Sequence, residues 1–199
     1  MPSPWNIPNA ITVARLVMTF ILLGLISATQ WWLTATALFI VAALSDVLDG
    51  YLARKWNQIT PVGRILDPFV DKILVGGSFI FLVAEPESGV TAWLAFAVIA
   101  REMFITGLRS VMEQRGFDFS AKLSGKIKMG LQSVTVPVCL ASLSREFMQF
   151  LGQSSATFLM LREVLLWGTL VITVYSGVEY TWQGLNMLQK PSKPAADDS

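Results

Sequence analysis

The chain has 199 residues, of which 53% are hydrophobic and only 15% are charged. A soluble domain carries charge on about a quarter of its residues, so this composition excludes an ordinary soluble protein. The sequence contains no histidine, which excludes Ser-His-Asp catalysis and histidine-ligated metals, and its net charge of +1 gives no basic bias toward nucleic acid.

Apolar stretches of the length of a membrane helix, roughly 20 residues, follow one another along the chain. They predict an all-α, polytopic membrane protein with six transmembrane helices, at residues 11–28, 32–53, 65–84, 91–112, 127–143 and 159–187. Residues 1–190 would form a single membrane domain, and residues 191–199 a polar, disordered tail.

The distribution of basic residues predicts how these helices are oriented. Lysines and arginines gather in the connections after the second and fourth stretches and in the tail, whereas the connection with Glu85 and Glu87 is acidic. By the positive-inside rule, both termini face the cytoplasm. No transit peptide precedes the first stretch, so we expect a multi-pass protein of a bacterial plasma membrane.

Four aspartates fall inside the second and third stretches or at their edges: Asp46, Asp49, Asp67 and Asp71. The first two are three residues apart and the last two are four apart, so each pair occupies one helix face. A short connection lets the two faces meet. Four carboxylates at low dielectric stay ionised together only around cations, and oxygen ligands alone favour Mg²⁺, Mn²⁺ or Ca²⁺. Two bridged metals of this kind suit phosphoryl transfer.

Small residues and one arginine accompany the aspartates. Gly50 and Ala53 share the helix face of Asp46, and Gly63 lies four residues before the third aspartate, which lets a ligand approach the backbone closely. Arg54 adds a fork-shaped donor suited to phosphate. This combination indicates a site for a metal-bound phosphate ester.

Other interpretations of the aspartates stay open. They could form a structural ion-pair network with Arg54, Arg64 or Lys72, or they could be the cation site of a divalent-cation transporter. A transport path has no need of Arg54. A non-catalytic membrane scaffold would leave the cluster unexplained.

The pattern that begins at Asp46 reads Asp-x2-Asp-Gly-x2-Ala-Arg-x8-Gly-x3-Asp-x3-Asp, and it resembles the signature of the CDP-alcohol phosphotransferase family at every specified position. The resemblance implies a six-helix membrane enzyme, a homodimer, that binds a CDP-linked lipid and two divalent cations, Mg²⁺ or Mn²⁺. An alcohol hydroxyl attacks the phosphorus that bears the lipid, and CMP leaves. The resemblance also implies residue roles: metal ligation by Asp46, Asp49, Asp67 and Asp71, general-base catalysis by Asp71, and a CDP pocket lined by Gly50, Ala53, Arg54 and Gly63.

Two further segments bear on the acceptor alcohol. Residues 100–109, AREMFITGLR, and residues 124–132, SGKIKMGLQ, resemble segments of phosphatidylglycerophosphate synthases, with Met129 standing where we expect a small hydroxyl residue. This resemblance implies transfer from CDP-diacylglycerol to sn-glycerol 3-phosphate, giving phosphatidylglycerol phosphate and CMP. Inositol phosphate, and phosphatidylglycerol giving cardiolipin, remain alternative acceptors.

Four cations suit an anionic acceptor, namely Arg101, Arg109, Lys126 and Lys128. Arg101 lies in an apolar stretch, where an unpaired charge is costly. Its neighbour Glu102 points about 100° away on a helix, so we expect Arg101 to have another partner, such as a substrate phosphate. The alternative is that these residues are positive-inside residues that contact lipid head groups.

The first stretch also contains polar residues. Asn9, Thr12 and Arg15 lie in a segment that resembles the start of phosphatidylglycerophosphate synthases. We predict that Asn9 and Thr12 contact the CDP group. Hydrogen bonding between packed helices is the alternative role for these residues.

Overall fold

The computed structural model describes residues 7–55, 60–117 and 123–188, without the side chains of residues 7, 8, 47–54, 61, 62, 64 and 188. Six long helices dominate these ranges, which contain no strand: α1 (Ile7–Ser27), α2 (Trp32–Lys55), α3 (Pro61–Val83), α4 (Ala92–Gln114), α5 (Leu123–Ser142) and α7 (Ser155–Leu188). The predicted all-α fold with six long helices is therefore confirmed.

A short helix, α6 (Arg145–Leu151), precedes α7 and was not predicted. The Ser144 hydroxyl caps it by accepting a hydrogen bond from the Phe147 amide at 3.3 Å. The ring of Phe147 packs edge-on against Phe158 of α7, with centroids 5.2 Å apart. Two turns are too few to produce a recognisable apolar period, which is why the sequence pattern missed this helix. Single 3₁₀ turns, η1 (Pro86–Ser88) and η2 (Gly152–Ser154), complete the connections.

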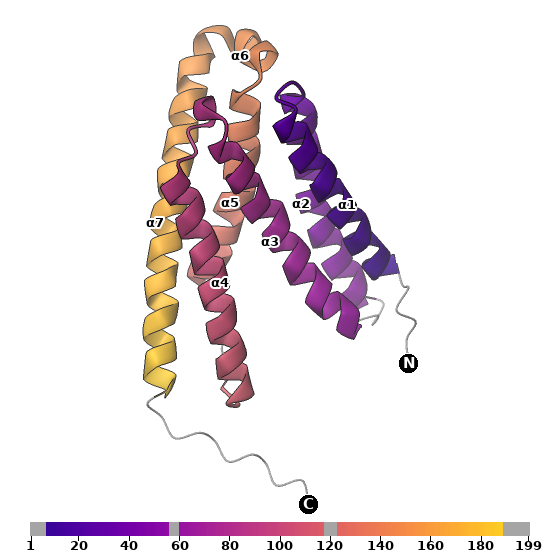
Figure 1. The fold of residues 1–199 in the computed structure, drawn as a ribbon, viewed down its shortest axis with the longest axis vertical. Coiled ribbons are helices and arrows are strands. Elements are labelled where there is room, and N and C mark those ends of the chain that lie inside the picture. The colour runs from indigo at the N-terminus through magenta and orange to yellow at the C-terminus, as the bar shows by residue number, and fades with distance from the viewer. Residues whose placement is uncertain (1–6, 56–59, 118–122, 189–199) are drawn as a thin grey trace, which may run out of the picture.

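The helices alternate in direction along the bundle. Helices α1, α2 and α3 form one side, and α4, α5 and α7 form the other (Figure 1). Helix α1 begins and α7 ends at the same end of the bundle, which we call the termini end, and α6 lies at the opposite end. Because the helices alternate, α2 and α4 end, and α3 and α5 begin, at the termini end.

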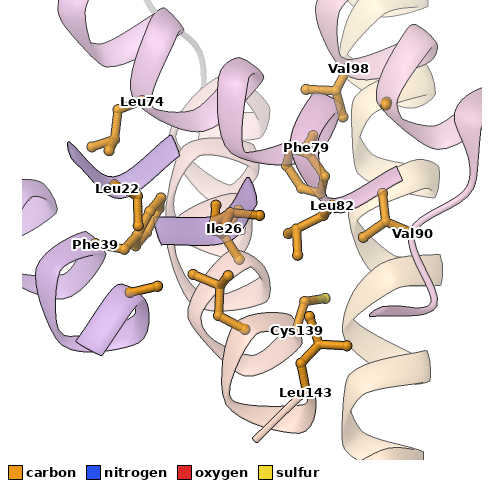
Figure 2. Packing of buried hydrophobic residues seen from close by; sticks show 14 of the residues in the cluster. Leu22, Ile26, Phe39, Leu74, Phe79, Leu82, Val90, Val98, Cys139 and Leu143 are labelled. Carbon is orange, nitrogen blue, oxygen red and sulfur yellow. The ribbon is translucent and has the colours of Figure 1, made fainter. Parts of the chain in front are cut away.

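The main apolar core fills the part of the bundle away from the termini end. Leu22, Ile26, Phe39, Phe79 and Cys139 are almost completely buried in it, and they come from four different helices (Figure 2). Each such side chain contributes about 1.5–3 kcal/mol when fully buried. The buried charged residues lie outside this cluster, in the half nearer the termini end.

Two stretches of the described chain are long and apolar enough to cross a membrane, Asn9–Ser27 and Arg145–Met187, and Trp32–Asp46 is a shorter apolar stretch. Helices α3 and α4 interrupt their apolar runs with charged residues, among them Asp71 and Glu102. These interruptions mark the part of the bundle in which the candidate site lies.

Candidate active site

One face of α1 is polar and ties this helix to α2 and α3. Asn9, Thr12 and Arg15 are spaced by three residues, so they lie on the same side of the helix. The fully buried Arg15 forms an ion pair with Asp46, and the Thr12 hydroxyl donates a hydrogen bond to Asp67 Oδ1 at 2.7 Å. Helix α1 therefore orients one aspartate of each predicted pair.

Asn9 contributes to a buried polar clamp at the start of α3. Its Nδ2 donates to the Thr60 hydroxyl at 2.9 Å, and the same hydroxyl accepts from the Gly63 amide at 3.0 Å as the N-cap of α3. Asn9 and Thr12 thus have the helix-packing role that was the alternative interpretation. Contact with CDP remains a prediction for both.

Gly63 has no room for a side chain. A Cβ there would lie 2.8 Å from Asn9 Oδ1 and 3.3 Å from Thr60 Oγ1. We expect Gly63→Ala to force Asn9 out of the clamp and to destabilise the protein by about 1–3 kcal/mol, as overpacked sites do. Thermal unfolding in detergent measures the effect. Gly24→Ala, where a Cβ meets nothing within 4 Å, is the matched control and should be neutral or slightly stabilising.

The described aspartates supply only oxygen donors. Asp46, Asp67 and Asp71 are partly buried, and no group of three acidic or thiol residues that could hold a metal is found among the described residues. The side chain of Asp49 lies outside the described residues, so the convergence of four carboxylates remains a prediction. Carboxylate oxygens are the kind of donor that suits a hard cation. The Thr12 hydroxyl orients Asp67 through one oxygen, as second-shell partners orient ligand carboxylates.

Three other residues of the predicted pocket, Gly50, Ala53 and Arg54, belong to α2, but their side chains also lie outside the described residues. An ion-pair network was predicted as one alternative for the aspartates, with Arg54, Arg64 or Lys72 as partners. The described structure gives Arg15 as a partner of Asp46, and the side chains of Arg54 and Arg64 lie outside the described residues, so that part of the alternative stays a prediction.

Glu102 of α4 joins two cations that the sequence suggested for the acceptor. Its Oε1 accepts a hydrogen bond from Arg101 Nη1 at 2.8 Å and forms an ion pair with Lys128 of α5. Lys128 is only 2% exposed, so this carboxylate neutralises a deeply buried charge. The Arg101 guanidinium also lies over the ring of Tyr180 in α7, 5.4 Å from its centroid.

Arg101 does have a partner besides Glu102, the ring of Tyr180. The expectation that Glu102 itself does not pair with Arg101 is wrong, because the two side chains form an ion pair. The expectation rested on the 100° angle between neighbouring Cα–Cβ directions. Both side chains have several rotatable bonds, and they meet by reaching around the helix. Lys128, which approaches from another helix, holds the Glu102 carboxylate in this position.

The four predicted cations do not form one cluster. Arg101 and Lys128 meet at Glu102, whereas Lys126 is exposed on another face of α5. Arg109 is partly buried, and its Nε has no hydrogen-bond partner among the described residues. Arg109 is thus a cation with donor capacity left for a ligand.

The Ser124-Gly125 part of the second acceptor-related segment packs against α7. The Ser124 hydroxyl donates to Glu179 Oε2 at 2.5 Å. A Cβ on Gly125 would lie 2.9 Å from the hydroxyl oxygen of Tyr180, so glycine permits the close approach of the two helices. Sequence reasoning missed Glu179 and Tyr180, because nothing in a single sequence shows that residues 55 positions apart are in contact.

Comparison with known proteins decides the family. Residues 5–175 match the sequence profile of the family described as CDP-alcohol phosphatidyltransferase. The chain belongs to this family. The resemblance inferred from the aspartate pattern is confirmed, and the chain is an enzyme of the phosphatidyltransferase class.

Several curated relatives carry the name CDP-diacylglycerol–glycerol-3-phosphate 3-phosphatidyltransferase. The relative from Bacillus subtilis (strain 168) is 34% identical, and the match covers 91% of this chain and 97% of the relative. The relative from Rickettsia bellii (strain RML369-C) is 30% identical over 88% of this chain and 93% of its own. The Escherichia coli (strain K12) relative is 36% identical over 66% of this chain and 75% of its own. This CDP-alcohol phosphatidyltransferase is therefore similar to several enzymes that carry the same name, and two of these matches cover about nine-tenths of both chains.

Proposed function

We propose that this CDP-alcohol phosphatidyltransferase transfers a phosphatidyl group from CDP-diacylglycerol to sn-glycerol 3-phosphate, giving phosphatidylglycerol phosphate and CMP. The observation that carries the proposal is the match to relatives with this named activity over about nine-tenths of the chain. The buried Lys128 beside Asp71, in a cavity between α3, α4 and α5, supports an anionic acceptor.

The chemistry is assigned to the aspartates. Asp46, Asp49, Asp67 and Asp71 would hold two divalent cations, Mg²⁺ or Mn²⁺, which neutralise the diphosphate and help CMP depart. Asp71 accepts the proton of the acceptor hydroxyl, whose oxygen then forms a bond to the phosphorus that bears the lipid. The bond from that phosphorus to the CMP oxygen breaks.

The remaining residues bind the two substrates. Gly50, Ala53, Arg54 and Gly63 line the CDP pocket, with Arg54 on the diphosphate. Lys128 and Arg109 face the acceptor phosphate: one lies in the cavity with Asp71, and the other has an unused buried donor. Lys126 has weaker support, because it is exposed. Arg101 is paired with Glu102 and Tyr180, and its Nε, like that of Arg109, has no hydrogen-bond partner among the described residues.

We further propose that all six long helices span the plasma membrane, with both termini and the active site on the cytoplasmic side. Large apolar side chains are exposed on the outer faces of the bundle, among them Phe20, Leu44, Phe96 and Trp167, each more than half exposed. Such a surface is unusual for a soluble monomer and suits contact with lipid or with a second copy in a homodimer. The basic connections at the termini end agree with the positive-inside rule.

CMP release by the purified protein tests the function. We expect turnover of CDP-diacylglycerol with sn-glycerol 3-phosphate in the presence of Mg²⁺ or Mn²⁺, and none after chelation of the metal. Turnover only with inositol phosphate or phosphatidylglycerol would agree with the roles proposed for the aspartates. It would overturn the proposal that glycerol 3-phosphate is the acceptor. If folded, metal-loaded protein releases no CMP with any acceptor but carries metal across proteoliposomes, the chain is a transporter.

A further inference from the structure

A small cavity lies between α3, α4 and α5, on the side of Asp71 away from α1. Its volume of about 90 Å³ is enough for several water molecules or a short polyol. Apolar residues such as Val75 and Ile99 line it together with six polar side chains, namely Asp71, Lys72, Glu102, Lys128, Gln132 and Ser133. The proposed general base and a buried cation therefore line the same cavity.

Among the polar residues of this cavity to which the proposed mechanism gives no role, Gln132 is the one with a buried polar atom that lacks a partner among the described residues. It is 2% exposed, and its Nε2 has no hydrogen-bond partner among the described residues. Burying an amide N–H without a hydrogen-bond partner costs free energy, so a buried donor of this kind usually bonds to a water molecule or a ligand. Lys128, by contrast, is already paired with Glu102.

The position of Gln132 relative to Lys128 defines what the amide can reach. The two residues are four apart on α5, so they share one face about 6 Å apart along the helix. Gln132 lies one turn farther from the termini end than Lys128. A ligand whose phosphate faces Lys128 in this cavity can therefore extend along α5 toward Gln132.

The chemistry of the acceptor leaves one group for this amide. In glycerol 3-phosphate, the phosphate is the partner of the cations, and the C1 hydroxyl gives its proton to Asp71. The C2 hydroxyl is the remaining polar group. It can both donate and accept a hydrogen bond, as can a glutamine amide.

We infer that Gln132 recognises the C2 hydroxyl of the acceptor, with its Nε2 as the donor, and that it selects acceptors that carry this hydroxyl. The inference rests on the proposed function and adds a specificity residue to it.

The test compares two acceptors on the same protein. 1,3-Propanediol monophosphate keeps the attacking hydroxyl and the phosphate of glycerol 3-phosphate but lacks the C2 hydroxyl. We expect the wild-type protein to prefer glycerol 3-phosphate about 10- to 100-fold in kcat/KM, the range for one buried hydrogen bond. Gln132→Met, which is similar in size, should bring this ratio close to one while the KM for CDP-diacylglycerol stays unchanged.

Two further variants control the experiment. Gln149→Met makes the same substitution at an exposed position of α6 and should keep the wild-type ratio. Gln132→Asn keeps an amide on a shorter side chain and should give an intermediate ratio of kcat/KM for the two acceptors. If the Gln132→Met protein does not fold, this variant takes its place in the test. The ratio itself is independent of the folded fraction, because both acceptors are measured on one preparation.

The outcomes separate the inference from the proposed function. A wild-type protein that uses both acceptors equally, or a Gln132→Met variant that keeps the full preference, would overturn the role of Gln132 and leave the proposed function intact. A wild-type protein that releases no CMP with glycerol 3-phosphate would overturn the proposed function, and the role of Gln132 with it.

Discussion

Replacing Asp71 with asparagine is expected to lower the rate of CMP release by about 10²- to 10⁴-fold, the usual contribution of a general base. Asparagine preserves the size of the side chain but cannot take the proton of the acceptor hydroxyl, and it removes a negative charge from the predicted metal site. The measurement is single-turnover CMP release with saturating CDP-diacylglycerol and glycerol 3-phosphate.

The control for this variant removes a carboxylate elsewhere. Glu163 lies in α7 near α6, where it pairs with Arg162 at 2.7 Å, so Glu163→Gln should release CMP at close to the wild-type rate. Both variants should elute as wild-type protein in size-exclusion chromatography. Substantial residual turnover by a correctly folded Asp71→Asn protein would show that another group accepts the proton.

Replacing Glu102 with alanine is expected to cause the largest loss of stability, about 3–5 kcal/mol in the free energy of unfolding. The substitution leaves Lys128, which is 2% exposed, as a buried charge without its partner, and it removes the acceptor of the Arg101 hydrogen bond. Thermal unfolding in detergent should show the loss as a lower midpoint.

A double variant separates the charge effect from the loss of packing. Glu102→Leu combined with Lys128→Met replaces the pair with apolar side chains and should recover much of the stability lost in Glu102→Ala. Glu113→Ala, at an exposed site on the same helix, should change the stability by about 0.5 kcal/mol or less. If Glu102→Ala unfolds at the same midpoint as Glu113→Ala, then Lys128 does not depend on Glu102.

The long helices were predictable because long apolar runs bounded by charged or turn residues carry a strong signal. The second stretch was predicted at residues 32–53 and forms α2 over Trp32–Lys55, for example. Helix ends were less certain, since an N-cap such as Thr60 lies in a polar segment that hydropathy alone does not resolve. Helix α6 was missed because it is too short to show a period.

The candidate site was predictable only where its residues are close in sequence. The aspartate pattern indicated the family because it resembles the family signature, and spacing on a helix fixed which aspartates share a face. The pair between Arg15 and Asp46 and the bridge from Lys128 to Glu102 join residues on different helices, 31 and 26 positions apart. Which helix faces meet depends on packing. No single-sequence pattern therefore shows that Glu102 has two cationic partners, or that Gln132 Nε2 has no hydrogen-bond partner among the described residues.

Asp71 is the one described aspartate of the family pattern that also lines the cavity between α3, α4 and α5. Asp46 and Asp67 are held from α1, whereas Glu102, Lys128 and Gln132 belong to α4 and α5. Under the proposed function, the bundle therefore has a donor module and an acceptor module that share a single reacting carboxylate. In evolution, substitutions in α4 and α5 can exchange one alcohol for another while the machinery that handles the activated lipid stays as it is.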